Sequence, residues 1–451
     1  MYSLMFANLK DLVSLKRLGR VSVHPKGLGA AFTYTSYDII TNIDTSHLAW
    51  VSFNDGKIKL LSTNVHGQFW FSNDIIGYLR NVNGTDQIFY SFFNPMTSKA
   101  LNEIQLTFFP SSVGNVKFHL TTNLLTFVAS VFSDGNIENS GDKVVFTSGV
   151  VYGILASFLT TDTLFVRHWD KYVDPERFSQ LFTLPLAIIG KKIKKYGEPL
   201  NLLMGTKLET PVPPDGGDED YEVSPDGKYV AFVSRVPNSN MAWNTNTDIY
   251  LVPTDGSRPP SSISAYNKGY DKHPKFSLDG SWLAWLQMPT PGYEADMNRI
   301  ALHSMDNSLD SFELKDWDRS PESITWTENG LVISAQEMGR LKLFKVTFDG
   351  MVEPWISEGS SHQLSYIPNY GFVFVKNSLT DTSDIFTSVK NVIRRVTNLN
   401  QDYMKNIQLT APEVNLDYLN IRKYGLKVQK TEWCMDGFLS PTISMPKKHI
   451  H

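Results

Sequence analysis

The chain has 451 residues, of which 41% are hydrophobic and 20% are charged, and its formal net charge is −4. This composition is typical of a soluble globular protein, and the charge gives no support for a nucleic-acid or membrane-surface partner. The single cysteine, Cys434, excludes an intrachain disulfide and a cysteine-based zinc site.

Residues 1–20 predict a short amphipathic helix that leads into the rest of the chain. The stretch MYSLMFANLKDLVSLKRLG lacks the unbroken apolar core and the small-residue cleavage site of a secretory signal. The longest apolar run, SGVVYGILASFL at residues 148–159, is too short to span a bilayer. We therefore expect no membrane partner.

Ser224-Pro225-Asp226-Gly227 predicts a tight turn between two strands. Serine is favoured at the first position of a type I turn, proline presets φ at the second, and glycine suits the last. The side chains of residues 229–234 then fall into two alternating sets, those at the odd-numbered and those at the even-numbered positions. This is the period of two expected of a strand. The stretch therefore predicts a hairpin.

Related turns recur along the chain and predict a repeat. They lie near Val23, Phe71, Phe118, Val223, Phe276, Trp326 and Ile367, at intervals of 41 to 53 residues apart from one of 105 residues, which we assign to a unit with an insertion. A unit of this length with four short strands is a propeller blade. The fold class is therefore predicted to be all-β, with a propeller of about seven blades over residues 21–412. The alternative is an irregular β-sandwich, which does not space one turn motif so evenly.

Three stretches resemble one peptidase group, in the same order. They are LFVRHWDKYVD at residues 164–174, TPVPPDGGDEDYEVSPDGKYVAFVSR at 210–235 and WLAWLQMPTPGYEADMNRIAL at 282–302. The chain is similar here to the fungal dipeptidyl-peptidase V group of the prolyl-oligopeptidase family of serine peptidases. The resemblance runs from about residue 11 to about residue 412, and its most specific parts are residues 167–170 and 216–220.

The resemblance implies an N-terminal propeller followed by an α/β-hydrolase domain with a Ser-His-Asp triad. The 451 residues contain no Gly-x-Ser-x-Gly elbow and no His-Gly-Gly motif. We therefore expect the hydrolase domain to be missing, no catalytic residue to be encoded, and residues 413–451 to form an irregular tail. Together with the extra residues 152–163 and the absent secretion signal, this suggests an imperfectly predicted gene with retained intron sequence and truncated ends.

Asp218, Glu219 and Asp220 place three carboxylates together and are the first candidate site. In a related aminopeptidase architecture, acidic propeller residues hold the N-terminal ammonium of the substrate, because an opposite charge in a partly dry cavity favours the charged amine. The alternative is a solvated acidic loop that leads into a blade. Arg167 and His168 are predicted to line the channel mouth and contact substrate. Their alternative is structural, with the arginine paired to an aspartate.

Other residues give weaker signals. Residues 293–296 with Arg299 predict a charged structural loop, and Asn83-Gly84-Thr85 is a glycosylation sequon that has meaning only in a secreted protein. His449 and His451 form only a weak pair in the tail, so we expect no metal and no cofactor.

The most specific hypothesis is the propeller portion of a serine dipeptidyl-peptidase. It would control the access of peptide substrates to a hydrolase domain that this sequence does not contain. The chain itself is expected to have no peptidase activity, because it encodes no catalytic triad. The alternative is a stand-alone propeller that binds peptides or protein partners without catalysis, and a non-functional fragment is also open. The resemblance implies an extracellular protein, whereas the missing signal implies a cytoplasmic one if Met1 is the true start.

Overall fold

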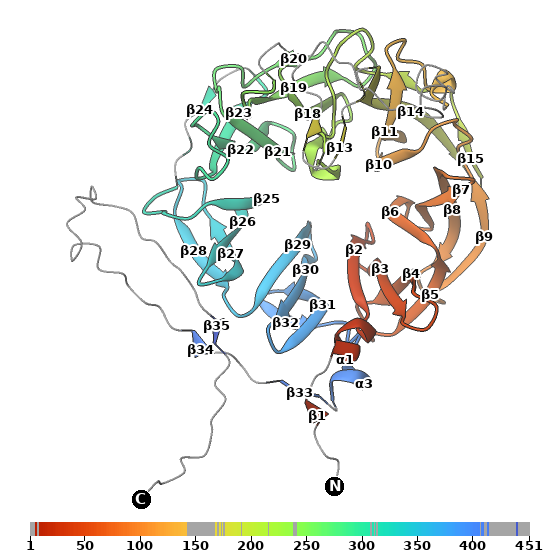
Figure 1. Cartoon of the computed structure of the whole chain (residues 1–451), viewed down its shortest axis with the longest axis vertical. Coiled ribbons are helices and arrows are strands. Elements are labelled where there is room, and N and C mark those ends of the chain that lie inside the picture. Colours follow the sequence, from red (N-terminus) through yellow and green to blue (C-terminus); the bar gives the residue numbers. More distant parts are fainter. Residues whose placement is uncertain are drawn as a thin grey trace, which may run out of the picture.

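The protein is a ring of small antiparallel sheets that follow one another in chain order (Figure 1). The computed structural model describes residues 5–6, 9–141, 167–168, 171–172, 174, 176–190, 192–214, 216–237, 241–306, 309–310, 312, 314–405, 407–409, 413–414 and 439–440. Within these residues the strands form seven blades, which confirms the predicted all-β propeller.

Blades 1 and 2 are built from consecutive strands, and blade 3 contains an insertion between its second and third strands. Blade 1 has β2 (Arg17–Val23), β3 (Gly29–Asp38), β4 (Ile43–Ser52) and β5 (Ile58–Thr63), and blade 2 has β6 (Val65–Ser72), β7 (Ile75–Val82), β8 (Thr85–Asn94) and β9 (Lys99–Gln105). Blade 3 has β10 (Val113–His119), β11 (Leu124–Phe132), β14 (Arg177–Ile189) and β15 (Lys192–Lys195), with β16 (Leu200–Asn201) also paired to β14.

The predicted insertion lies inside blade 3. Its second and third strands are separated by residues 133–176, which include the 3₁₀ turn η1 (Ile137–Asn139) and the pair β12 (Arg167–His168) and β13 (Lys171–Tyr172). The long interval between the third and fourth turn motifs is thus explained by this one connection.

Blades 4 to 7 repeat the pattern. Blade 4 has β17 (Tyr221–Val223), β18 (Tyr229–Arg235), β19 (Thr247–Pro253) and β20 (Ser261–Ser262), and blade 5 has β21 (Tyr270–Phe276), β22 (Trp282–Met288), β23 (Arg299–Ser304) and β24 (Leu309–Asp310). Blade 6 has β25 (Pro321–Thr327), β26 (Gly330–Glu337), β27 (Arg340–Val346) and β28 (Val352–Ile356), and blade 7 has β29 (Ser360–Ile367), β30 (Gly371–Ser378), β31 (Asp381–Val389) and β32 (Val392–Arg395). One parallel pairing, Thr247 with Tyr270, joins blades 4 and 5.

The remaining described elements lie outside the blades. They are β1 (Met5–Phe6), α1 (Leu9–Ser14), the 3₁₀ turn η3 (Asp218–Asp220), α3 (Gln401–Met404), β33 (Ile407–Gln408), β34 (Glu413–Val414) and β35 (Leu439–Ser440). Among the described helices, none combines the length and hydropathy needed to cross a membrane. The domain boundaries proposed from the sequence stay predictions.

Apolar packing between neighbouring blades forms the core. Each of the seven buried clusters within the described residues spans one seam, including the seam between blades 7 and 1. The alternation of β18 shows why: Val230 and Phe232 pack toward blade 3, whereas Ala231 and Val233 pack toward blade 5. Full burial of one such side chain contributes about 1.5–3 kcal/mol, so each blade is stabilised mainly by its two neighbours.

The repeated turn motif connects the first and second strands of each blade. In blade 4, the Gly227 N–H donates to the Ser224 carbonyl (2.8 Å), and the Ser224 hydroxyl donates to the Asp226 carboxylate (2.6 Å). Blade 5 repeats the second contact between Ser277 and Asp279 at the same distance. These contacts lie within the turn itself, so the turn motif sets the register of each hairpin locally.

The inner strands are not regular, and their irregularity links the blades. Four of them have a left-handed residue where the register shifts, namely Gly67, Asn115, His273 and Gln363. The Gln363 amide donates to the Gly19 carbonyl (3.0 Å) and accepts from the Val21 N–H (2.9 Å), both on blade 1. His273 on blade 5 likewise forms a hydrogen bond with the backbone of the next blade, at Glu322 on blade 6.

Contacts between the two ends of the described chain close the ring. The Asn400 side chain bonds both backbone groups of Lys16, each at 2.9 Å, and the Tyr403 hydroxyl donates to Asp11 on α1 (2.6 Å). In Figure 1, α1 and α3 lie side by side next to blades 1 and 7. No described blade mixes strands from the two ends, so these side-chain contacts, the apolar packing of blades 7 and 1 and the short parallel pair of β1 with β33 hold the two ends together.

Replacement of Gly227 by alanine tests the close packing of the blade 4 turn on blade 3. Gly227 and Gly292 both have φ of +72°, but a Cβ at Gly227 would lie 2.6 Å from Thr122 Cγ2, whereas a Cβ at Gly292 has no atom within 4 Å. Left-handed alanine costs about 1 kcal/mol at either site, and overpacking adds about 1–3 kcal/mol at Gly227 only. Urea denaturation of Gly227→Ala and Gly292→Ala should show this difference. Equal losses of stability would contradict it.

Candidate functional site

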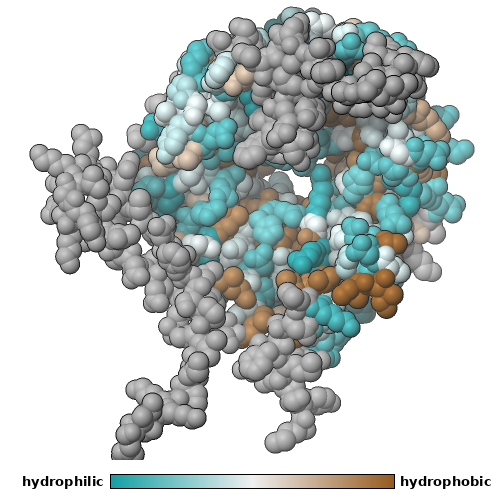
Figure 2. Space-filling model, in the orientation of Figure 1, coloured by the Kyte–Doolittle hydropathy of each residue, from teal (hydrophilic) through white to brown (hydrophobic). Residues whose placement is uncertain are grey.

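Charged side chains on the inner strands line the central channel. Seen along the ring axis, Figure 2 shows an opening at the centre with hydrophilic residues around it. The Glu222 carboxylate on β17 forms ion pairs with Lys117 on β10 and with Lys275 on β21, and its Oε2 lies 3.0 Å from the Nζ of each lysine. These three side chains are only 20% to 31% exposed and join blades 3, 4 and 5.

The Glu222 carboxylate is held in its ionised form. Burial alone would raise its pKa, but the ammonium groups of Lys117 and Lys275 outweigh burial and lower the pKa to about 2. The carboxylate thus stays charged at any pH at which the protein is expected to work, and it neutralises part of the positive charge of the two lysines.

A second ion pair reaches from blade 1 to the start of blade 4. Arg20 on β2 binds Asp218 on η3 at 2.7 Å, and both side chains are a little over one third exposed. Because blades 1 and 4 are not neighbours, this pair narrows the channel on the face where the inner strands begin. We call this the proximal face; it includes η3 and the loops that hold Thr245 and Glu294.

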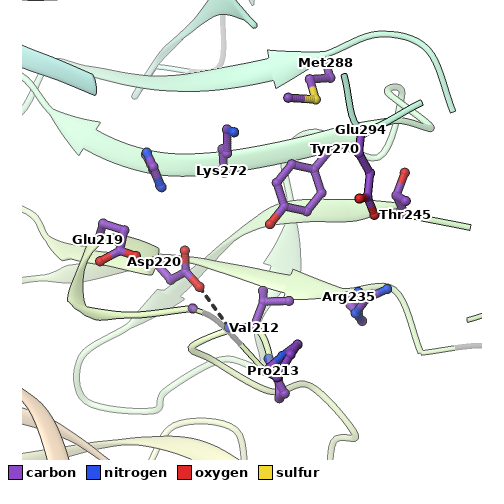
Figure 3. Close-up of a pocket in the computed structure, with 13 residues that line it drawn as sticks. Val212, Pro213, Glu219, Asp220, Arg235, Thr245, Tyr270, Lys272, Met288 and Glu294 are labelled. Carbon is purple, nitrogen blue, oxygen red and sulfur yellow. Dashed lines mark hydrogen bonds between the residues drawn. The ribbon is translucent and has the colours of Figure 1, made fainter. Parts of the chain in front are cut away.

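A cavity of about 320 Å³ opens on the proximal face between blades 4 and 5. We call it the first cavity. Figure 3 shows the carboxylates of Glu219 and Asp220 on one side of it and Arg235, Thr245 and Glu294 on the other. The rest of its lining is Val212, Pro213, Pro214, Gly216, Tyr270, Lys272, His273 and Met288. The cavity is therefore acidic at one end and mixed in charge at the other.

The structure separates the three predicted carboxylates because successive residues of a 3₁₀ turn point in different directions. Asp218 faces the channel and Arg20, whereas Asp220 is 5% exposed and its Oδ2 accepts a hydrogen bond from the Val212 N–H (2.9 Å). Among the described residues, Glu219 has no ion-pair or hydrogen-bond partner, and it faces the first cavity. Glu219 is thus the member of the trio that can bind a ligand directly.

Asp220 and His273 complete the acidic end. Burial, together with the charge of Glu219, raises the pKa of Asp220 to about 6. Burial, together with Lys272 and Lys275, lowers the pKa of His273 to about 4, so its ring is neutral near pH 7. The ligand atoms of Glu219, Asp220 and His273 lie within 4.8 Å of one another. This spacing could hold a metal ion. The positive charges of Lys272 and Lys275, however, repel a divalent cation more strongly than a ligand with a single positive charge.

A second cavity of about 630 Å³ adjoins the first between blades 5 and 6. The two cavities share Lys272, His273, Met288 and Glu294, so they form one continuous trough across three blades. The other residues that line the second cavity are Ala295, Asp296, Met297, Asn298, Asp318, Ser320 and Glu322.

The remaining predicted site residues lie elsewhere. Arg167 and His168 form β12, which pairs with β13, and their placement at a channel mouth stays a prediction. Asn83 lies at the exposed tip of the β7–β8 hairpin with φ of +53°. Trp169, Asp170, His449 and His451 fall outside the described residues.

Most of the trough could not be found from the sequence. Tyr270 and Lys272 carry no motif, and they line one cavity with Glu219 only because blades 4 and 5 pack together. Glu294 belongs to the charged loop that was predicted to be structural, and it lines both cavities. The one usable signal was the acidic run itself.

Solved structures define the class of the fold. The chain matches acylaminoacyl peptidase of Pyrococcus horikoshii with a TM-score of 0.60 and 15% identity, over 92% of this chain and 58% of that one. It also matches the β-propeller domain of the Trilobed protease from Pyrococcus furiosus, which has an open velcro topology, with a TM-score of 0.53 and 12% identity, over 86% and 97%. The fold is that of a β-propeller.

Sequence relatives are more specific. Dipeptidyl-peptidase 5 of Arthroderma otae is 31% identical over 356 residues, which are 75% of this chain and 48% of the relative. That of Aspergillus fumigatus is 28% identical over 415 residues, which are 87% and 57%. The chain is homologous to the fungal dipeptidyl-peptidase 5 proteins, which confirms the resemblance seen in its sequence, and it spans about half their length. No established family profile matches it.

Glu222→Gln should destabilise the propeller because it leaves two lysines facing one another with no carboxylate between them. We expect the free energy of unfolding to fall by about 3 kcal/mol. Lys275→Met is the matched comparison: it should cost less, because Lys117 still neutralises Glu222. Urea denaturation measures both, and a larger loss for Lys275→Met would show that the carboxylate is not the centre of the network.

Asp220→Asn should change how stability depends on pH. A carboxyl whose pKa is raised by folding adds stability that is complete below its unfolded pKa and is lost as the pH rises through the folded value. Between about pH 4 and pH 6 the wild type should therefore lose up to about 2 kcal/mol relative to the variant. Thermal unfolding at several pH values measures this, with Asp255→Asn at an exposed turn as the control. A constant difference across this range would contradict the burial of an ionising carboxyl.

Proposed function

We propose that the chain is the propeller portion of a serine dipeptidyl-peptidase, and that its first cavity receives the free N-terminus of a peptide. The observation that carries the proposal is the Glu219 carboxylate, which faces a cavity and has no partner among the described residues. The homology to the dipeptidyl-peptidase 5 proteins supports the reaction class, which is the release of dipeptides from a peptide N-terminus.

The chemistry of the acidic end suits an ammonium group. A primary ammonium has three N–H donors and no acceptor, and Glu219 and the free carboxylate oxygen of Asp220 are both acceptors. Charge-assisted hydrogen bonds of this kind are about twice as strong as neutral ones. Binding of the ammonium at a fixed point would set how far the peptide reaches, and so which bond is presented for cleavage.

The ring supports a gating role in this proposal. The channel is bordered by charged inner strands, and the Arg20–Asp218 ion pair reaches across it from blade 1 to the start of blade 4. In this proposal the pair restricts the channel to chains that are not folded. Closure of the ring by Asn400 and Lys16 keeps the blades together. Extended peptides would therefore enter and folded proteins would be excluded.

The proximal face supports the proposal of a catalytic partner domain. The β3–β4 connection of blade 1 presents Ile39, Ile40 and Ile43, which are 52%, 91% and 59% exposed. The corresponding loops of blades 4 and 7 add Trp243 and Leu379, which are 76% and 60% exposed. Exposed apolar side chains of this size mark interaction sites. We propose that a hydrolase domain covers them in the active enzyme.

One observation favours a second candidate function. The 451 residues contain no Gly-x-Ser-x-Gly elbow, so this chain by itself could be a propeller that binds peptides without catalysis. Hydrolysis of a dipeptide anilide by the purified chain separates the two states, because the chain as printed should show none. An extracellular location is proposed from the relatives' group, and the exposed Asn83 sequon is compatible with it.

Glu219→Gln tests the ammonium site directly. Fluorescence anisotropy should show that this variant binds a labelled peptide with a free N-terminus about tenfold more weakly than the wild type, because one charge-assisted contact is lost. The N-acetylated form of the same peptide should bind both proteins equally weakly. Glu198→Gln, at an exposed position of blade 3, is the control. If Glu219→Gln leaves the affinity for the free peptide unchanged, the ammonium does not bind there.

A further inference from the structure

The second cavity is rich in carboxylates, and nearby cations balance only part of their charge. Four carboxylates line it, from Glu294, Asp296, Asp318 and Glu322, against one lining cation, Lys272. Asp318 forms an ion pair with Arg319 (3.1 Å), and the positive charge of Arg299 interacts with the carboxylate of Asp296. Glu294 and Glu322 form no ion pair among the described residues; their charges interact only at longer range, Glu294 with Arg235 and Glu322 with Lys272.

Asn298 also lines the second cavity and carries an acceptor without a donor. The residue is 5% exposed, and its Nδ2 donates to the Pro321 carbonyl (2.8 Å). Its Oδ1 has no hydrogen-bond partner in the described part of the chain and is closed off from solvent. A buried amide oxygen without a donor costs about 1–3 kcal/mol, and a ligand N–H would satisfy it once the Asn298 side chain turned toward the cavity.

Lys272 does not satisfy these acceptors. Its Nζ lies 5.4 Å from the centre of the Tyr270 ring, and its charge acts on both Asp220 in the first cavity and Glu322 in the second. One ammonium shared between two cavities leaves acceptors in the second cavity unsatisfied.

The second cavity also has an apolar wall. Met288, Ala295 and Met297 line it beside the carboxylates. Lysine and arginine side chains need this combination, because their aliphatic stems pack on apolar surface while their charged heads reach acceptors. A bare metal ion would make no use of the apolar wall.

We propose that the second cavity binds a lysine or arginine side chain of a peptide whose N-terminus lies in the first cavity. The four residues shared by the two cavities allow one extended peptide to span both. The trough would thus prefer peptides with a basic residue a few positions after the N-terminus. The inference rests on the proposed function for the identity of the ligand as a peptide and for the place of its N-terminus in the first cavity.

Binding of designed hexapeptides to the 451-residue chain tests the inference. One internal position at a time is made lysine or norleucine, which has the same stem without the charge, and each peptide is made with a free and with an acetylated N-terminus. At the position that reaches the second cavity, the lysine peptide should bind about tenfold more tightly than the norleucine peptide. The doubly substituted variant Glu294→Gln/Glu322→Gln should reduce this preference to about twofold or less.

Glu353→Gln on the outer strand of blade 6 removes the same kind of charge at an exposed site and should leave the preference unchanged. Equal binding of lysine and norleucine peptides at every position would overturn the inference, as would a preference that survives in the double variant. A lysine preference that is independent of acetylation would retain the second cavity and overturn the ammonium site. Absence of binding by every peptide would overturn both.

Discussion

No blade of this protein can bury both faces of its own sheet, and the whole structure depends on neighbouring blades to do so. Each of the seven apolar clusters in the described residues crosses a seam. The arrangement is stable only when the ring is closed, which here relies on packing between blades 7 and 1 and on the clamp of Asn400 on Lys16. The velcro exchange of a strand between the chain ends is absent from the described blades.

This constraint also decides where function can lie. Because the second and third strands of a blade are committed to packing, the inner strands and the loops at the seams are the places where polar side chains can stay accessible. The trough occupies two adjacent seams on the proximal face, and its residues come from three blades. The Lys117–Glu222–Lys275 network stabilises the inner strands beside it without using the Glu219 carboxylate.

The fold could be predicted from the sequence because its information is local. Ser224 and Asp226 bond within their own turn, and Ser277 and Asp279 repeat the contact, so the motif could be counted along the chain. Even the insertion in blade 3 followed from the spacing of these turns.

The site could be predicted only in part, because its contacts are not local. The acidic run drew attention to the right place, but the sequence does not show that Asp218 pairs with Arg20 almost two hundred positions away, or that Asp220 turns inward to Val212. Nor does it show that Glu294 of blade 5 lines the same cavity as Glu219 at the start of blade 4. These partners depend on which blades are neighbours and on the direction of each side chain.

If peptides bind along the proximal face with the N-terminus at Glu219, a crystal structure of the chain with a bound free-amino peptide should show it. We expect the peptide nitrogen within hydrogen-bond distance of the Glu219 carboxylate, with the peptide backbone running from blade 4 toward blade 6. A peptide that lies in the opposite direction, or on the opposite face of the ring, would contradict it.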